Sequence, residues 1–136
     1  MKIALFGKNI IENHHSFLEK LLQRLHDLDC HILIYEQWKS PIETIRKSGI
    51  PYDTFATYHD LRSADYLLSI GGDGTLLDTL PLVHNTGIPV LGINIGRLGF
   101  LSAVSRDEIE TVLDCIINKK IMLEPRTLLE IKSDDY

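Results

Sequence analysis

An apolar run that ends in a glycine-rich turn constrains the fold of this chain more than any other stretch. Residues 66–70 read Tyr-Leu-Leu-Ser-Ile, and residues 71–75 (Gly-Gly-Asp-Gly-Thr) follow directly. A short apolar run of this kind predicts a buried strand, and glycine permits both a sharp turn and the close approach of a ligand to the backbone. The alternative is a plain strand-to-helix turn in which Asp73 or Thr75 caps the helix. Both interpretations predict a strand that leads through a tight turn into a helix.

The rest of the chain alternates between strand-like and helix-like segments. Short apolar runs predict strands at residues 3–6, 31–35, 65–70 and 89–95. Apolar residues at helical spacing and local helix signals predict helices at residues 13–28, 42–47, 76–85 and 105–117. Strands that alternate with helices favour an α/β fold, here a Rossmann-like, open, mostly parallel sheet with helices on both faces.

Local signals mark several helix ends. Asn13 or Ser16 is expected to cap the first long helix. Ser105, with Glu108 three residues later, forms a capping-box pattern before the last helix. Pro81 lacks an amide hydrogen, so the helix around it is expected to kink or to divide into two short pieces.

The pattern changes near the end of the chain. Residues 121–124 and 127–132 resemble strands with no helix between them. We therefore expect an α/β nucleotide-binding domain at residues 1–120, followed at 121–136 by the start of a β-rich domain whose remainder is absent. Residues 51–58 are polar and aromatic and fit no predicted element.

Composition argues against several classes of protein. The chain has 136 residues, 44% hydrophobic and 24% charged, which suits one soluble domain. The formal net charge of −5 argues against sequence-independent binding of nucleic acid. No apolar run approaches the ~18 residues of a membrane span. Cys30 and Cys115 lack metal-ligand spacing, as do the histidines, which favours reduced thiols in a cytoplasmic protein without a metal site of its own.

A second glycine-rich stretch overlaps the end of the strand predicted at 89–95. Residues 92–101 read Gly-Ile-Asn-Ile-Gly-Arg-Leu-Gly-Phe-Leu and include Asn94, Arg97 and Phe100. Open α/β sheets bind ligands at the carboxyl ends of their strands. We therefore expect the two glycine-rich stretches to share one crevice. The alternative is that their glycines serve turns only.

The first turn has the residues that phosphoryl transfer to a hydroxyl requires. A carboxylate such as Asp73 can accept the hydroxyl proton. Backbone N–H groups freed by glycines can hold phosphate oxygens, and a divalent cation such as Mg²⁺ accompanies a nucleotide. Lys8 and Arg126 can each meet a phosphate, although lone basic residues are more often solvated. The sequence has neither a P-loop nor a dinucleotide-binding fingerprint.

Residues 71–75 and 92–101 together closely resemble the NAD kinase family. Residues 126–131 (Arg-Thr-Leu-Leu-Glu-Ile) are similar to the segment that enters this family's second domain. Gly-Gly-Asp-Gly-Thr alone is shared with diacylglycerol and sphingosine kinase-like proteins, and a close variant occurs in 6-phosphofructokinases, whereas the second stretch is much more specific. The resemblance covers most of the chain and leaves the roles of Arg97 and Arg126 open.

The resemblance implies an enzyme that uses ATP to phosphorylate the 2′-hydroxyl of the adenosine ribose of NAD, giving NADP. A divalent cation, Mg²⁺ or another, would accompany the ATP. On this basis Asp73 is the catalytic base, and it contributes to NAD binding together with Gly72, Gly74, Asn94 and Phe100.

The resemblance also implies contacts with the phosphates of ATP. These would come from Gly7, Lys8, Gly74 and Thr75. The expected partners are small-molecule nucleotides, with no nucleic acid and no membrane. The full-length enzyme is expected to be a homo-oligomer in the cytoplasm.

The chain departs from the family in its length. Family members are roughly twice as long in domain terms. Their second, β-rich domain carries an Asn-Asn-Glu/Asp motif that grips NAD, and no Asn-Asn pair occurs here. We therefore expect a fragment of a longer kinase. Two other functions stay open, a lipid kinase-like catalytic domain and a non-catalytic nucleotide-binding module.

Overall fold

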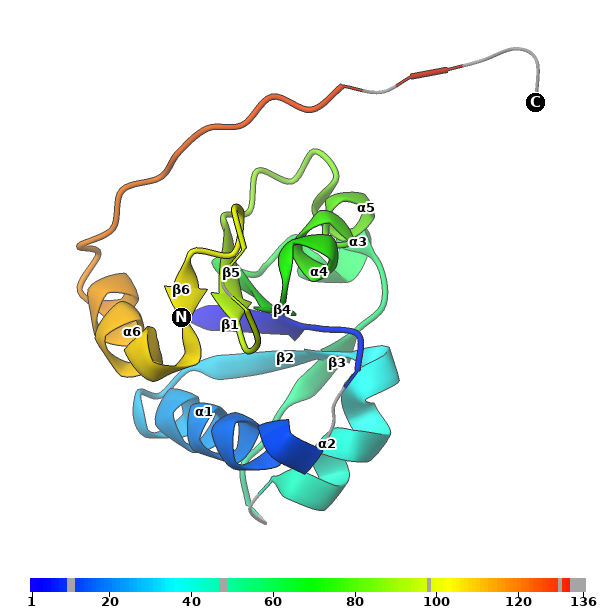
Figure 1. The fold of residues 1–136 in the computed structure, drawn as a ribbon. Helices are drawn as coiled ribbons and strands as arrows, with labels where there is room; N and C mark the ends of the chain where they lie inside the picture. Colours follow the sequence, from blue (N-terminus) through cyan, green and yellow to red (C-terminus); the bar gives the residue numbers. More distant parts are fainter. Residues whose placement is uncertain (10–11, 47–48, 98, 130, 133–136) are drawn as a thin grey trace.

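A parallel sheet of six strands forms the centre of the computed structural model, in the order β3-β2-β1-β4-β5-β6 (Figure 1). The structure describes residues 1–9, 12–46, 49–97, 99–129 and 131–132. Strands β1 to β6 are Lys2–Phe6, His31–Tyr35, Asp53–Phe55, Tyr66–Gly71, Val90–Asn94 and Val104–Ser105. Helices α1 to α6 are His15–Asp27, Lys39–Ile45, Tyr58–Leu61, Asp73–Leu77, Leu80–Val83 and Ile109–Ile117. This strand order is that of the doubly wound nucleotide-binding folds, which confirms the expected fold class.

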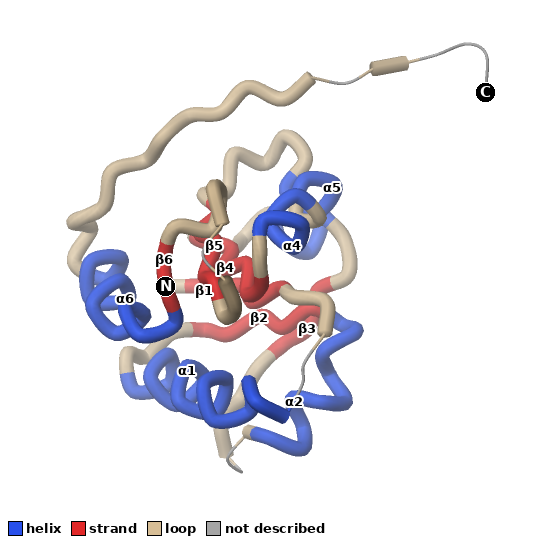
Figure 2. The backbone as a smooth tube through the Cα atoms, in the orientation of Figure 1, coloured by secondary structure: helices blue, strands red, loops and turns tan. Residues whose placement is uncertain are grey.

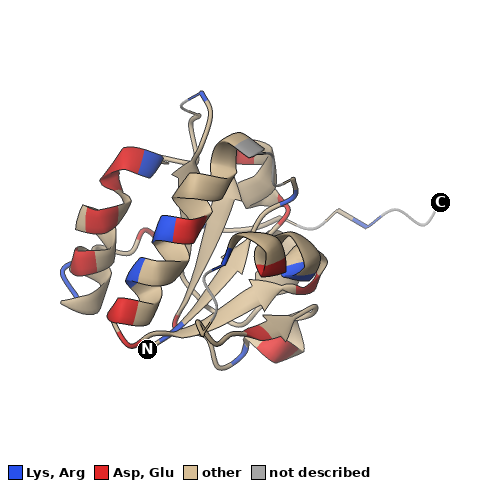
Figure 3. Ribbon diagram, turned by 90° about the horizontal axis from the view of Figure 1, so that it is seen from below, with Lys and Arg blue, Asp and Glu red and all other residues tan. Residues whose placement is uncertain are grey.

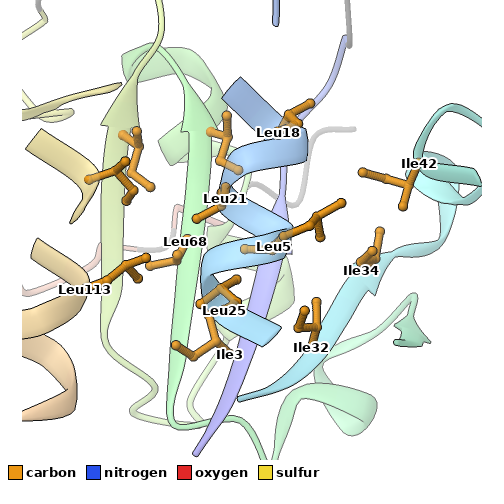
Figure 4. Packing of buried hydrophobic residues seen from close by; sticks show 14 of the residues in the cluster. Ile3, Leu5, Leu18, Leu21, Leu25, Ile32, Ile34, Ile42, Leu68 and Leu113 are labelled. Carbon is orange, nitrogen blue, oxygen red and sulfur yellow. The ribbon is translucent and has the colours of Figure 1, made fainter. Parts of the chain in front are cut away.

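Helices cover both faces of the sheet (Figure 2). In β1, Ile3 and Leu5 belong to a core cluster that includes residues of α1, α2 and α6, whereas Ala4 and Phe6 belong to a second cluster with Leu61 of α3. Successive side chains of a strand point to opposite faces, so one apolar run feeds both cores. Figure 4 shows the first cluster, with Leu18, Leu21 and Leu25 of α1 over the sheet. Burial on both faces explains why the inner strands read as continuous apolar runs.

The four predicted strands are present, and the two that sequence patterns missed lie at the edges of the sheet. β3 has three residues, within the unassigned segment 51–58, and β6 has two. Each of these strands pairs on one side only, and in β3 only Phe55 is buried. So short a strand with one buried residue leaves no apolar run to detect.

The helix signals gave mixed results. The segment around Pro81 divides into α4 and α5, with the proline in the first turn of α5, as one of the two predictions had it. The capping-box prediction is also confirmed, because the carboxylate of Glu108 accepts the backbone N–H of Ser105 at 2.9 Å. The prediction that Asn13 or Ser16 caps α1 is wrong, since a 3₁₀ turn runs directly into the helix and no side chain caps it.

The helix predicted at 42–47 is present as α2, displaced toward the N-terminus. It begins at Lys39 and ends at Ile45, while residues 47–48 lie outside the described part of the chain. Pro41 therefore falls in the first turn, where the missing amide hydrogen has no intrahelical partner to lose.

The strand predicted at 121–124 is wrong, and no strand occurs in the described part of 127–132. The segment instead extends away from the sheet after α6 (Figure 1). A strand requires a neighbour for its backbone N–H and C=O groups, and this segment lies beside none. Its side chains are exposed too, with Met122 at 96%, Leu129 at 91% and Ile131 at 93%. The domain division at residue 120 stays a prediction.

Figure 3 marks acidic and basic residues along the ribbon, and both kinds occur on the helices. Arg24 of α1 contacts Glu110 at 2.9 Å and Asp114 at 2.8 Å, which ties α1 to α6. Cys30 and Cys115 are both free thiols, as predicted. Within the described ranges, no helix has the length and apolar character needed to cross a membrane.

Replacing Ser105 with Ala is expected to lower the free energy of unfolding by about 0.5–2 kcal/mol. The substitution removes the side-chain hydroxyl that caps the start of the last helix, and it leaves the Glu108 carboxylate with one bond fewer. Urea denaturation followed by circular dichroism measures the change. Ser16→Ala is the matched control, because Ser16 is exposed and caps nothing, and a shift beyond about 0.5 kcal/mol there would contradict the capping argument.

Candidate active site

The two glycine-rich stretches lie side by side at the carboxyl edge of the sheet. β4 and β5 are neighbours, with Gly71 paired to Asn94 at the ends of the two strands. β1 is the other neighbour of β4, so Gly7 and Lys8 emerge beside the same edge. The strand order reverses between β1 and β4, and ligands of open α/β sheets bind at such a switch point. The two stretches therefore lie together at one edge of the sheet, and their sharing of a ligand crevice stays a prediction.

The Asp73 side chain joins the two stretches directly. Its Oδ2 accepts the backbone N–H of Phe100 at 2.8 Å, and its Oδ1 accepts those of Leu101 at 2.9 Å and Ser102 at 3.0 Å. Gly72, not Asp73 or Thr75, is the N-cap of α4, and no side chain caps this helix. The carboxylate therefore bridges two loops and does not serve as a helix cap.

Hydrogen bonds to the ionised form set the charge state of Asp73. The N–H of Ser102, followed by those of Phe100 and Leu101, holds the pKa of the Asp73 carboxyl below its usual value of 3.8. The sign follows because an N–H group donates a stronger bond to a carboxylate than to a neutral carboxyl, so all three bonds favour the ionised form. Asp73 is therefore an ionised hydrogen-bond acceptor at neutral pH.

The glycines of the two stretches divide into two kinds. A Cβ at position 99 would overlap Oδ1 of Asp73 and lie 2.6 Å from its Cγ, so only glycine permits the bridge. A Cβ at Gly71 would overlap the Thr75 hydroxyl in the same way. At Gly72 and Gly74, apart from the adjacent residues and the backbone of the helix itself, no described atom lies within 4 Å of the Cβ position. Neighbouring atoms explain why positions 99 and 71 require glycine. Gly72 and Gly74 instead leave open backbone at the surface of the site.

Asn94 and Phe100 have different surroundings. Asn94 is 4% exposed, its Nδ2 donates to the carbonyl oxygen of Arg97, and its Oδ1 accepts the N–H of Gly96 at 2.8 Å. Its amide thus fixes the turn after β5. Phe100 is fully exposed, although its backbone is held by Asp73.

Gly7 and Lys8 contact residues that sequence patterns did not point to. A Cβ at Gly7 would overlap Cζ2 of Trp38 and lie 2.8 Å from the carbonyl oxygen of Ile70, so buried packing requires this glycine. The ammonium group of Lys8 lies 2.5 Å from Asp78 at the end of α4. Lys8 is thus held beside the first glycine turn, but a carboxylate already partners it.

Several features of the site had no signal in the sequence. The amides of Leu101 and Ser102 are backbone groups, so residue type could not identify them. Asp78 stands five residues after Asp73 with no motif around it. Arg126, which the sequence offered as a phosphate contact, pairs with Glu124 at 2.8 Å in the extended segment beyond α6. A surface hollow of about 470 Å³ lies elsewhere, between α1 and α6.

Comparison with known proteins gives the family. Residues 9–121 match the model of the ATP-NAD kinase N-terminal domain. The NAD kinase of Flavobacterium psychrophilum is 38% identical over 133 residues, which are 97% of this chain and 45% of that protein. The NAD kinase of Christiangramia forsetii is 34% identical over 135 residues, 98% of this chain and 46% of that protein. The chain thus spans about half the length of these curated relatives.

A solved structure shares the fold. Yeast NADH kinase in complex with NADH superposes with a TM-score of 0.75 at 23% identity, over 88% of this chain and 38% of that one. Both glycine-rich stretches lie inside the range that the family model matches. The chain belongs to the NAD kinase family.

Proposed function

We propose that this chain is the N-terminal part of an enzyme that transfers the γ-phosphoryl group of ATP to the 2′-hydroxyl of the adenosine ribose of NAD, giving NADP. One observation carries the proposal. The ionised carboxylate of Asp73 and the fully exposed ring of Phe100 are held together at the switch point of the sheet, by two glycine-rich loops. Membership of the NAD kinase family supports the choice of substrate and reaction.

The proposed step is a direct displacement at phosphorus. A bond forms between the 2′-oxygen and the γ-phosphorus, the bond from that phosphorus to ADP breaks, and the hydroxyl proton passes to Asp73 and then to solvent. A carboxylate offers about four acceptor positions. Three backbone N–H groups occupy three of them, which leaves one on Oδ2 for the hydroxyl. Because transition states of this kind are loose, orientation of the hydroxyl contributes more than strong basicity.

The remaining site residues are proposed to act in two groups. Phe100 lies against NAD, Asn94 shapes the turn that borders it, and the open backbone at Gly72 and Gly74 faces the reacting groups. A large exposed aromatic with no packing partner is suited to cover the flat surface of a nucleotide.

The phosphates of ATP are proposed to meet the backbone of Gly74, the Thr75 hydroxyl and the Lys8 ammonium group near Gly7. Lys8 would exchange its contact with Asp78 for a phosphate oxygen. A phosphate carries more charge than a carboxylate and offers more acceptors, so the exchange favours the nucleotide.

A divalent cation is proposed to arrive with ATP. In the described residues, no group of three or more His, Cys, Asp or Glu side chains is placed to hold a metal ion. Mg²⁺ is commonly bound by substrate phosphates and water with only one or two carboxylates. The described residues therefore fit a cation carried by the nucleotide.

A β-rich domain after residue 120 is proposed to complete the site. The curated relatives are about twice as long as this chain. The exposed apolar side chains of Met122, Leu129 and Ile131 need a covering surface, because exposed apolar area of this kind is unfavourable in water. A second domain packed on this segment would provide that surface and the missing half of the site.

The test is an assay of the full-length protein with ATP and Mg²⁺ and either NAD or diacylglycerol as acceptor. We expect phosphorylation of NAD, with the product identified as NADP by its reduction with an NADP-specific dehydrogenase. Phosphorylation of diacylglycerol in place of NAD would contradict the proposal and favour a lipid kinase. Binding of ATP without turnover of either acceptor would favour a non-catalytic nucleotide-binding module.

A further inference from the structure

We propose that Asp73 and Gly99 form a clamp that positions Phe100, in addition to any contact that Asp73 makes with substrate. The clamp is the carboxylate of Asp73 together with the backbone of residues 99–102. The inference deepens the proposed function and depends on it only for the identity of the ligand, NAD. Gly99 thereby becomes a positioning residue of the site.

The bonding pattern supports the clamp. Three consecutive amides, from Phe100 to Ser102, point at a single carboxylate, and both of its oxygens are used. Bonds from backbone N–H groups to an ionised carboxylate are shorter and stronger than those between neutral groups. Two loops 27 to 29 residues apart in sequence are thus joined through one side chain.

The packing of the segment explains what the clamp controls. Ser102 is fully buried, and a Cβ at Gly92 would lie 2.8 Å from its Cα, so β5 holds this end of the segment independently of Asp73. Phe100 is 100% exposed and Leu101 is 42% exposed. The Phe100 side chain therefore has no packing of its own, and its position follows from its backbone, which Asp73 holds.

Gly99 is the residue that allows the clamp to close. A Cβ at this position would overlap Oδ1 and lie 2.6 Å from Cγ of Asp73. Alanine would push the segment away from the carboxylate while leaving the charge of Asp73 intact. Gly96 offers a matched control in the same loop, because the nearest atom to its Cβ position is Oδ1 of Asn94 at 3.9 Å.

The experiment measures hydrogen exchange and NAD binding in the full-length protein. In Gly99→Ala, and independently in Asp73→Ala, we expect amide exchange in residues 100–102 to accelerate by about tenfold or more. NAD affinity, measured by calorimetry, is expected to fall by about tenfold or more in both variants. Gly96→Ala should change neither quantity. Asp73→Ala adds no bulk, so it keeps the test valid if Gly99→Ala fails to fold.

Two further measurements separate the possible failures. Phe100→Ala should weaken NAD binding while amide exchange at the clamp keeps its slow rate. This result would show that the Phe100 ring contributes to the affinity for NAD. Unchanged exchange in both clamp variants would overturn the clamp, and faster exchange with unchanged NAD affinity would overturn its positioning role. Failure of the unmodified protein to bind NAD would instead contradict the proposed function, while the exchange rates would still decide whether the clamp exists.

Discussion

Asp73→Asn in the full-length protein is expected to lower kcat for NADP formation by about 10²–10⁴-fold, the range typical of a lost general base. The substitution nearly preserves shape but removes the negative charge that is proposed to face the hydroxyl. It also replaces one acceptor oxygen with an NH₂ group, which can only donate. Because each oxygen of Asp73 faces a backbone N–H, one donor would then oppose another.

The comparison of Asp73→Asn with Asp73→Ala separates the two roles of this residue. Asn retains one oxygen, which can still accept the amides of Leu101 and Ser102, whereas Ala accepts none. Both variants should lose kcat to a similar extent, and Ala should raise KM for NAD more than Asn does. Asp114→Asn, on the outer side of α6 beside Arg24, is the control and should leave kcat unchanged. Wild-type kcat in Asp73→Asn would contradict the assignment of Asp73 as the base.

The low pKa of Asp73 predicts how stability and rate depend on pH. Its folded-state pKa lies below the usual 3.8, because three backbone N–H groups stabilise the ionised form. The contribution of these bonds to stability is therefore complete above the unfolded-state pKa and is lost as the pH falls through the folded-state value. Asp73 stays ionised between pH 5 and 8, so a change in rate within that range must come from another group.

The sequence predicted the fold where strands are buried on both faces. β1, β2, β4 and β5 carry apolar side chains into two cores at once, which leaves a signal that residue type alone reveals. β6 has two residues and no buried side chain, and it is held chiefly by backbone hydrogen bonds to β5. Backbone bonds carry no residue signature, so such a strand becomes visible only in the structure.

The same division holds within the site. The residue type and motif of Asp73 predict a chemical role, and the family resemblance predicts one for Phe100. The link between them is made by backbone amides, and its requirement for Gly99 is a matter of distance. The sequence also suggested a ligand role for Asn94, but the structure gives its buried amide bonds within its own turn. Residue type predicted which groups gather at the sheet edge, and only geometry assigns their hydrogen bonds.

Gly7→Ala is expected to lower the free energy of unfolding by about 1–3 kcal/mol, the usual effect of overpacking a core. The new Cβ would overlap Cζ2 of Trp38, lie 2.5 Å from Cη2 of the same ring and lie 2.8 Å from the carbonyl oxygen of Ile70. Trp38 is 2% exposed, so its ring has little room to retreat. Urea denaturation followed by circular dichroism measures the loss. Gly72→Ala is the control, because no described atom beyond the adjacent residues lies within 4 Å of its Cβ position.

A double-mutant cycle with Trp38→Phe tests whether the Trp38 ring is the cause. Phenylalanine lacks the outer ring atoms that the Cβ would strike, although the carbonyl of Ile70 stays in place. The double variant should therefore be more stable than the sum of the two single changes by at least about 0.5 kcal/mol. Additive losses would mean that the ring is not what excludes alanine. In contrast to Gly7→Ala, Gly72→Ala should retain stability and lose NADP formation, because the first glycine packs in the core and the second is proposed to face the ligand.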